Sequence, residues 1–200
     1  MEPGYLLGMV LQSIPEPRKI ARELFALNLD RTTLWQALFL MLVTGAIFGV
    51  GSSILFPPSE ELSGTLFAMP LVVAIAEASV AIISVFLIYF IGRAAGGTGR
   101  FEDGILTVAW LNFVLLIVQA VVLVLSLFAP SMAALLWLFG GFTGIWILSH
   151  FTAEAHGFAS AMRVFLTILL VSFIAVAILS IVLAILGVGA AMTSGELGNV

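Results

Sequence analysis

The chain of 200 residues contains no cysteine and very few charged residues. The absence of cysteine excludes disulfides, thiolate metal sites and a cysteine nucleophile. Charged residues make up only 9% of the sequence and apolar residues 62%, whereas a soluble domain has roughly 25% and 45–50%. A soluble monomer of this composition would lack the polar groups to coat its surface. The net charge of −4 offers no basic patch for phosphates, which excludes nucleic acid as a partner.

Long stretches without charge predict membrane-spanning helices, each of which needs about 20 apolar residues. The 50 residues between Asp103 and Glu154 are enough for two such helices. We expect a break at Ala129-Pro130-Ser131, because proline lacks an amide hydrogen and disfavours helix in the residue before it. The sequence therefore predicts an all-α integral membrane bundle of five helices. The expected spans are 34–56, 67–92, 105–129, 132–150 and 164–187.

Positive charge falls only on alternate connections between these spans. The basic residues are Arg18, Lys19, Arg22, Arg31, Arg93, Arg100 and Arg163. The 57–66 loop, the Pro130 turn and the tail after 187 contain none. Five spans place all seven on one side, which the positive-inside rule assigns to the cytoplasm. We expect a multi-pass protein of the cell membrane (the inner membrane in a Gram-negative cell) with a cytoplasmic amino terminus and an extracytoplasmic carboxyl terminus.

The region before the first span predicts a short amphipathic helix from Arg18 to Asn28. Pro17 suits its first turn, and Ile20, Leu24 and Leu27 share one face. This helix either lies in the cytoplasmic membrane interface, with its cations near lipid headgroups, or packs on the cytoplasmic loops. The expected organisation is a cytoplasmic segment at 1–33, a transmembrane domain at 34–188 and a short extracytoplasmic tail at 189–200.

Glu77 lies inside the second predicted span. A carboxylate there is expensive to bury and suggests a proton or cation site. The alternative is a hydrogen-bonded carboxyl that helps two helices to pack. Asn112 and Gln119, seven residues apart in the third span, share a face and could be its partners. The residues favour the structural interpretation, because transport usually needs more than one intramembrane charge.

Pairs of glycines spaced by four predict close helix packing. Gly45 and Gly49 lie in the first span, and Gly140 and Gly144 in the fourth. Glycine at this spacing lets helix backbones approach closely. The partner helix could belong to this chain or to another copy.

The segment 92–104 is rich in glycine and contains Gly96, Gly97 and Gly99. It lacks the GK[ST] ending of a nucleotide-binding loop, and no strand precedes it. We therefore interpret it as a solvated cytoplasmic connection between two spans rather than as a phosphate site.

His150, Glu154 and His156 cluster at the end of the fourth span, followed by Gly157 in a short cytoplasmic loop. Two imidazoles and a carboxylate are possible zinc ligands. However, the spacing is not HExxH, and Glu154 and His156 lie on different faces of a continued helix. We expect hydrogen bonding at the interface, no metal, no cofactor and no catalytic residue.

Three stretches together resemble the Yip family of five-span membrane proteins. They are EPRKIARELFALN before the first span, GGTGRFEDGILTVAW at 96–110 and AEAHGFASAMRVFLTILL at 153–170. The resemblance covers about residues 15–188 and is greatest to compact prokaryotic members. It implies a helical bundle with a cytoplasmic amino terminus. In eukaryotic relatives it also implies roles in membrane traffic and binding of Rab-type GTPases and other Yip proteins.

The chain departs from those relatives, because it lacks their long amino-terminal region and a DLYGPFW-like stretch, which argues against GTPase binding. Two functions follow. The first is a non-enzymatic scaffold or organiser that associates in the lipid bilayer with itself or with other membrane proteins. The second is a small transporter or channel component that uses Glu77, Asn112 and Gln119. A polar cavity converging on Glu77 would favour the second, and a dry bundle with Glu77 bonded to one side chain the first.

The distribution of charge makes a direct prediction of topology. Reporter fusions after residues 62, 97, 130, 157 and 200 should read outside, inside, outside, inside and outside, because only alternate connections are basic. Alkaline phosphatase and green fluorescent protein activities measure the two sides. Any other order would contradict the five-span topology.

Overall fold

The computed structural model describes residues 3–57 and 68–185, which form seven helices and no strand. The helices are α1 (Pro3–Gln12), α2 (Pro17–Phe25), α3 (Arg31–Leu55), α5 (Pro70–Ala94), α6 (Phe101–Ser126), α7 (Pro130–His156) and α8 (Ala161–Ile185). The last five are long and apolar enough to cross a membrane, which confirms the predicted all-α class. Most of the 57–66 loop, the end of the last span and the 189–200 tail lie outside the described residues.

The ends of α6 and α7 can be compared with two boundaries predicted from the sequence. The break around Pro130 is confirmed, because α6 ends at Ser126 and Pro130 occupies the first turn of α7. Helix α7 continues to His156, six residues beyond the predicted end of the fourth span at 150. Phe151 and Ala153 in this extension are fully buried, so packing against the protein continues the helix beyond the length that hydrocarbon requires.

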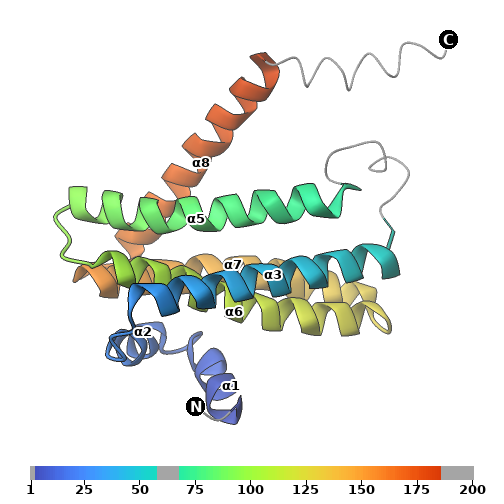
Figure 1. Ribbon diagram of the computed structural model, residues 1–200, viewed down its shortest axis with the longest axis horizontal. Coiled ribbons are helices and arrows are strands. Elements are labelled where there is room, and N and C mark those ends of the chain that lie inside the picture. The colour runs from blue at the N-terminus through green and yellow to red at the C-terminus, as the bar shows by residue number, and fades with distance from the viewer. Residues whose placement is uncertain (1–2, 58–67, 186–200) are drawn as a thin grey trace.

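Helices α3, α5, α6 and α7 run along a common axis, and α8 leaves them at an angle (Figure 1). Leu34 and Leu38 of α3, Val85 of α5 and Ile105 and Val108 of α6 form one buried core cluster. All seven Lys and Arg residues lie near the end where α3, α6 and α8 begin and α5 and α7 end. We call this the basic end of the bundle, and the other the opposite end.

The two predicted glycine pairs behave differently. A Cβ atom at Gly140 would lie 2.9 Å from Cγ1 of Val118, and one at Gly144 would be in ordinary contact with α6. The fourth-span pair therefore packs closely against α6. A Cβ atom at Gly45 or Gly49 would meet no atom within 4 Å, and Gly45 lines the cleft between α3, α5, α6 and α7. For these two glycines, close packing within the chain is wrong, and contact with another copy stays a prediction.

Helix α2 packs on α6 and α7, whereas the predicted placements were the membrane interface and the cytoplasmic loops. Ile20, Ala21 and Leu24 are almost completely buried and join a core cluster with Trp110 and Phe151. The helix ends at Phe25, short of the predicted Asn28, whose φ of 45° is not helical. The amphipathic pattern thus serves contact with protein.

The connection between α1 and α2 is held by two tryptophans. The Nε1 of Trp110 donates to the buried Ser13 hydroxyl at 3.0 Å, and that hydroxyl donates to the Met9 carbonyl at 2.8 Å. The Nε1 of Trp146 donates to the Ile14 carbonyl at 3.1 Å. The sequence did not predict α1, which is too short to span a membrane. Its position beside α6 and α7 depends on these tertiary bonds.

The glycine contacts predict different responses to the same substitution. Gly140→Leu should destabilise the protein by about 1–3 kcal/mol, because the added side chain overpacks against Val118. Gly49→Leu is the matched control, since its added atoms enter open space. Melting of the purified protein in detergent measures both. Equal melting temperatures for the two variants would contradict a packing role for Gly140.

Candidate functional site

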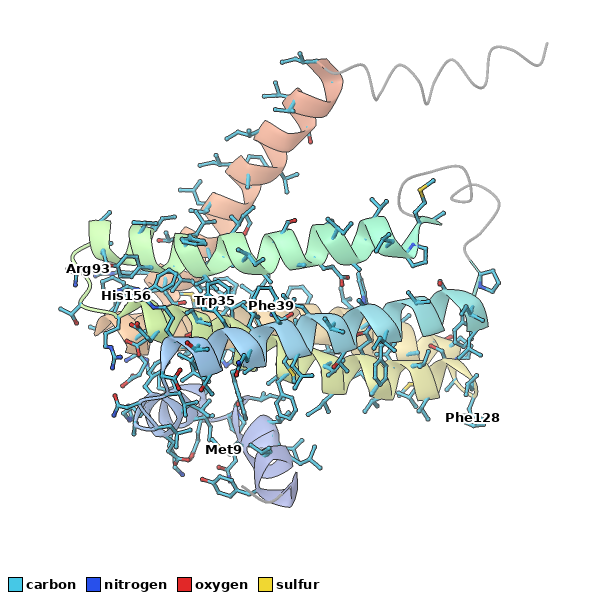
Figure 2. The ribbon with its side chains drawn as sticks, in the orientation of Figure 1. Met9, Trp35, Phe39, Arg93, Phe128 and His156 are labelled. Carbon is cyan, nitrogen blue, oxygen red and sulfur yellow. The ribbon has the colours of Figure 1, made fainter. Side chains whose placement is uncertain are left out.

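Two connections that are far apart in the sequence meet at His156, at the basic end (Figure 2). His156 is the last residue of α7 and is only 3% exposed. Gly157 ends the helix in the left-handed conformation that favours glycine, with φ 71°. The Thr98 amide donates to the His156 carbonyl and the Gly99 amide to Nδ1 of the ring, both at 3.2 Å. The 95–100 loop is therefore fixed to the end of α7.

Three glycines form the walls around the imidazole. A Cβ atom at Gly92 would overlap the ring itself, and Cβ atoms at Gly97 and Gly99 would lie 2.6 and 2.7 Å from its nearest atoms. Gly96 instead provides a positive φ of 86° for the turn. Gly97 and Gly99 are buried, so the interpretation as a solvated connection is wrong for these two glycines, whereas Gly96, Thr98 and Arg100 are exposed as it expects. The glycines are required because a buried side chain occupies the space beside them.

The hydrogen bonds of His156 define its chemical state. Because Nδ1 accepts from the Gly99 amide, that nitrogen carries no proton, and a neutral ring carries its proton on Nε2. The ring also stacks on Phe158, with ring centroids 5.6 Å apart. Its burial and these bonds suit a structural role, and leave Nδ1 unable to bind a metal in this arrangement.

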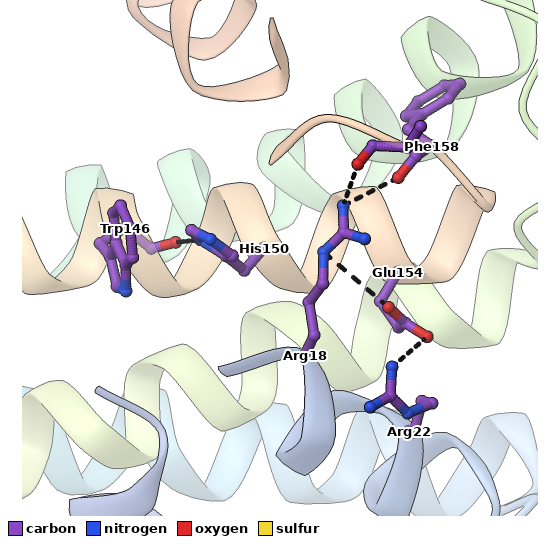
Figure 3. A network of polar contacts seen from close by, with 7 residues as sticks. Arg18, Arg22, Trp146, His150, Glu154 and Phe158 are labelled. Atoms are coloured by element: carbon purple, nitrogen blue, oxygen red, sulfur yellow. Dashed lines mark hydrogen bonds and ion pairs between the residues drawn. The ribbon is translucent and has the colours of Figure 1, made fainter. Parts of the chain in front are cut away.

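Glu154 binds α2 rather than the neighbouring histidines (Figure 3). Arg22 Nη1 donates to its Oε1 at 3.2 Å, and Arg18 Nε lies 4.0 Å from its Oε2. Arg18 Nη2 also donates to the Phe158 carbonyl at 2.8 Å. His150 Nδ1 lies 2.9 Å from the Trp146 carbonyl. Glu154 therefore joins α2 to α7, and Arg18 joins α2 to the loop that leads into α8.

The three predicted metal-ligand candidates consequently do not converge. His150, Glu154 and His156 each face a different set of partners. Across residues 3–57 and 68–185, no group of three His, Cys, Asp or Glu side chains is placed to hold a metal ion. The contacts of Glu154 and His156 hold segments of the chain together.

A second set of ion pairs joins α3 to α6 at the same end. Arg31 Nη2 lies 2.8 Å from Glu102 Oε1, and its guanidinium lies over the Phe101 ring, 5.1 Å from the centroid. Asp30 caps α3 by accepting from the hydroxyl and the amide of Thr33. The hydroxyl bond, followed by the amide bond, lowers the pKa of the Asp30 carboxyl, because both favour its charged form.

The three predicted intramembrane polar residues line one cleft. Glu77, Asn112 and Gln119 face a space of about 980 Å³ between α3, α5, α6 and α7, with walls that are mostly apolar. Glu77 is exposed to this space and makes no hydrogen bond or ion pair with the described part of the chain. Asn112 Nδ2 donates to the Val108 carbonyl at 2.8 Å. The residues are brought together, but none is bonded to Glu77.

The packing of α5 against α6 sets the depth of these residues. A Cβ atom at Gly104 would lie 3.3 Å from the Val85 carbonyl oxygen, which marks where the antiparallel helices touch. Glu77 is eight residues before Val85, and Asn112 is eight residues after Gly104. Both therefore lie at the same depth. At 1.5 Å per residue, Glu77 is about 10 Å from the start of α5 at Pro70.

A second groove, of about 450 Å³, lies between α5 and α8. Thr152 contributes to its floor, and the Thr152 hydroxyl is the one buried side-chain polar atom without a partner in the described residues. Sequence reasoning missed both Thr152 and Gly92. Gly92 belongs to the glycine-rich segment 92–104, which could have indicated close packing. Thr152 is an ordinary threonine in an apolar helix, and nothing in the sequence distinguishes it from other threonines.

The glycine pocket of His156 can be tested by a double-mutant cycle. Gly92→Ala should destabilise the protein by about 1–3 kcal/mol, because the new methyl group overlaps the imidazole. In a His156→Ala background the same change should be neutral or stabilising by up to about 1 kcal/mol, since alanine favours helix and the ring is gone. Melting in detergent measures all four proteins. If the losses of stability caused by Gly92→Ala and His156→Ala were additive in the double variant, the contact between Gly92 and the His156 ring would be contradicted.

Comparison with known proteins agrees with this architecture. The family model of the Yip1 domain matches residues 11–183, from α1 almost to the end of α8. No curated protein and no solved structure matches the chain. The match includes both loops that meet at His156 and all five long helices. The chain therefore belongs to the Yip1 domain family of multi-pass membrane proteins.

Proposed function

We propose that this protein is a non-enzymatic membrane scaffold that binds apolar transmembrane helices, of other proteins or of a second copy, through α8. The observation that carries the proposal is the separation of α8 from the rest of the bundle (Figure 1). A helix that leaves its own bundle presents both sides to the bilayer and to other helices.

Only the first turns of α8 pack against the protein. Ala161 and Val164 form a small buried cluster with Ala153 of α7, with Ile168 packed against it. Further along, large apolar side chains are exposed, including Phe173 at 74%. In a bilayer, helices associate by close packing rather than by the hydrophobic effect. The uncovered length of α8 is thus available to a partner helix without unfolding anything.

The basic end of the bundle supports an orientation of the protein in the membrane. We place it in the cytoplasm, because it gathers every Lys and Arg of the chain. Lys19 of α2 is more than half exposed there and suits contact with lipid headgroups. The ion pairs of Glu154 and Glu102 keep this end rigid, which gives α8 a fixed base.

The cleft around Glu77 favours a second candidate, transport of a proton or small cation. Three polar side chains face one space there, as a transporter would require. The remaining lining is almost entirely apolar, which does not suit a continuous aqueous path. Proton flux in reconstituted vesicles, lost in Glu77→Gln, would support this candidate over a scaffold alone.

Site-specific photocrosslinking tests the scaffold. A photoreactive residue at Phe173 of α8 should give protein–protein adducts in native membranes, at twice the mass for a second copy or at another mass for a different protein. Leu40 of α3 is the matched control, because it is also exposed, at 60%, but lies on a helix packed within the bundle. Adducts at Phe173 no more abundant than at Leu40 would overturn the proposal.

A further inference from the structure

The cleft between α3, α5, α6 and α7 holds a carboxylate, Glu77, that no Lys or Arg of the described residues pairs with. All seven Lys and Arg residues lie near the basic end, whereas Glu77 is about 10 Å from the opposite end of α5. An intramembrane carboxylate without a partner is costly. A positive counterpart for the charged carboxylate would therefore come from outside the described part of the chain.

Asn112 offers a hydrogen-bond acceptor at the depth of Glu77. Its amide nitrogen donates one of its two N–H groups to the Val108 carbonyl, and its oxygen accepts no hydrogen bond from the described residues. Because Asn112 lies at the depth of Glu77, the two carboxylate oxygens and this amide oxygen form a set of three acceptors. A primary ammonium group has three donors and no acceptor, which matches that set.

The rest of the cleft suits an alkyl chain. Its walls include Ala81, Leu111, Leu115 and Leu148. Along α6 the cleft extends from Gln119 to Val108. Asn112 lies about 10 Å from the Gln119 end and about 6 Å from the Val108 end, so the walls cover the first part of an alkyl chain. The volume of about 980 Å³ and the predominance of apolar lining, with a few polar groups, are typical of small-molecule sites.

We propose that this cleft binds a long-chain primary amine, with its ammonium group between Glu77 and Asn112 and the first part of its alkyl chain along the apolar walls. The helix α5 spans about 37 Å, against about 30 Å of hydrocarbon, so Glu77 lies inside the hydrocarbon on the opposite side from the basic end. A phosphate attached to the amine would be drawn toward Glu77, with no Lys or Arg nearby. An amine without a phosphate is therefore the better ligand. This site goes beyond the scaffold role and does not depend on it.

Photoaffinity labelling in vesicles of phosphatidylcholine tests the site. The probe is a C16 primary amine that carries a diazirine in its chain, and the same chain with a terminal hydroxyl or trimethylammonium group is compared with it. The amine should label the wild-type protein about tenfold more than the other two, because only it combines charge with three donors. The labelled peptides should come from the cleft segments of α5, α6 and α7. Equal labelling by the three probes, or labels outside the cleft, would overturn the proposal.

Two variants and a competitor sharpen this test. Glu77→Gln should reduce labelling by the amine about tenfold and leave labelling by the alcohol unchanged, whereas Glu23→Gln, on the exposed face of α2, should change neither. Excess phosphatidylethanolamine should not compete, because of its phosphate. Competition by this lipid, or full amine labelling of a folded Glu77→Gln protein, would contradict the assignment. Labelling of the wild type by the three probes decides the question even where a variant does not fold. None of these results depends on crosslinks from α8.

Discussion

The fit of the His156 ring between Gly92, Gly97 and Gly99 is the contact on which the arrangement of the spans depends. It joins the end of α5, the loop into α6 and the end of α7 at one buried point. Because no side chain separates these segments, α5 lies close to α6 at the basic end, where Gly104 meets Val85. Farther from that point nothing comparable holds α5, and the cleft around Glu77 is located there.

Charges at the basic end reinforce this junction from outside. Glu154 takes Arg18 and Arg22 from α2, and Glu102 takes Arg31 from α3. These pairs are partly exposed, so each contributes little stability alone. Their value is geometric, since they connect α2, α3, α6 and α7 around the point where the loops already meet. The same charges that predict the orientation of the chain therefore also fasten its polar end.

Away from the basic end, the described chain has a largely apolar surface and few polar contacts between helices. Helix α8 leaves the bundle after Ile168, and the cleft exposes Glu77 without a partner from the described chain. Both features make sense in a bilayer, where apolar surface costs nothing but an unpaired carboxylate does. Association through α8 and an amine in the cleft address different parts of this surface. Neither requires a catalytic group, which agrees with the structural use of His156.

The sequence by itself determined the number of helices that could cross a membrane, the break at Pro130, the shared end for all cations and the family resemblance. These follow from local properties, because hydrocarbon requires long apolar runs and proline interrupts a helix wherever it lies. Only the tertiary structure decided that Gly97 and Gly99 are buried, that Gly140 packs while Gly49 does not, and that Glu77 lacks a partner. These outcomes depend on which side chain of a distant segment lies next to each residue, as the ring of His156 lies next to the three glycines. The spacing of residues within a uniformly apolar helix does not specify which segment packs against it.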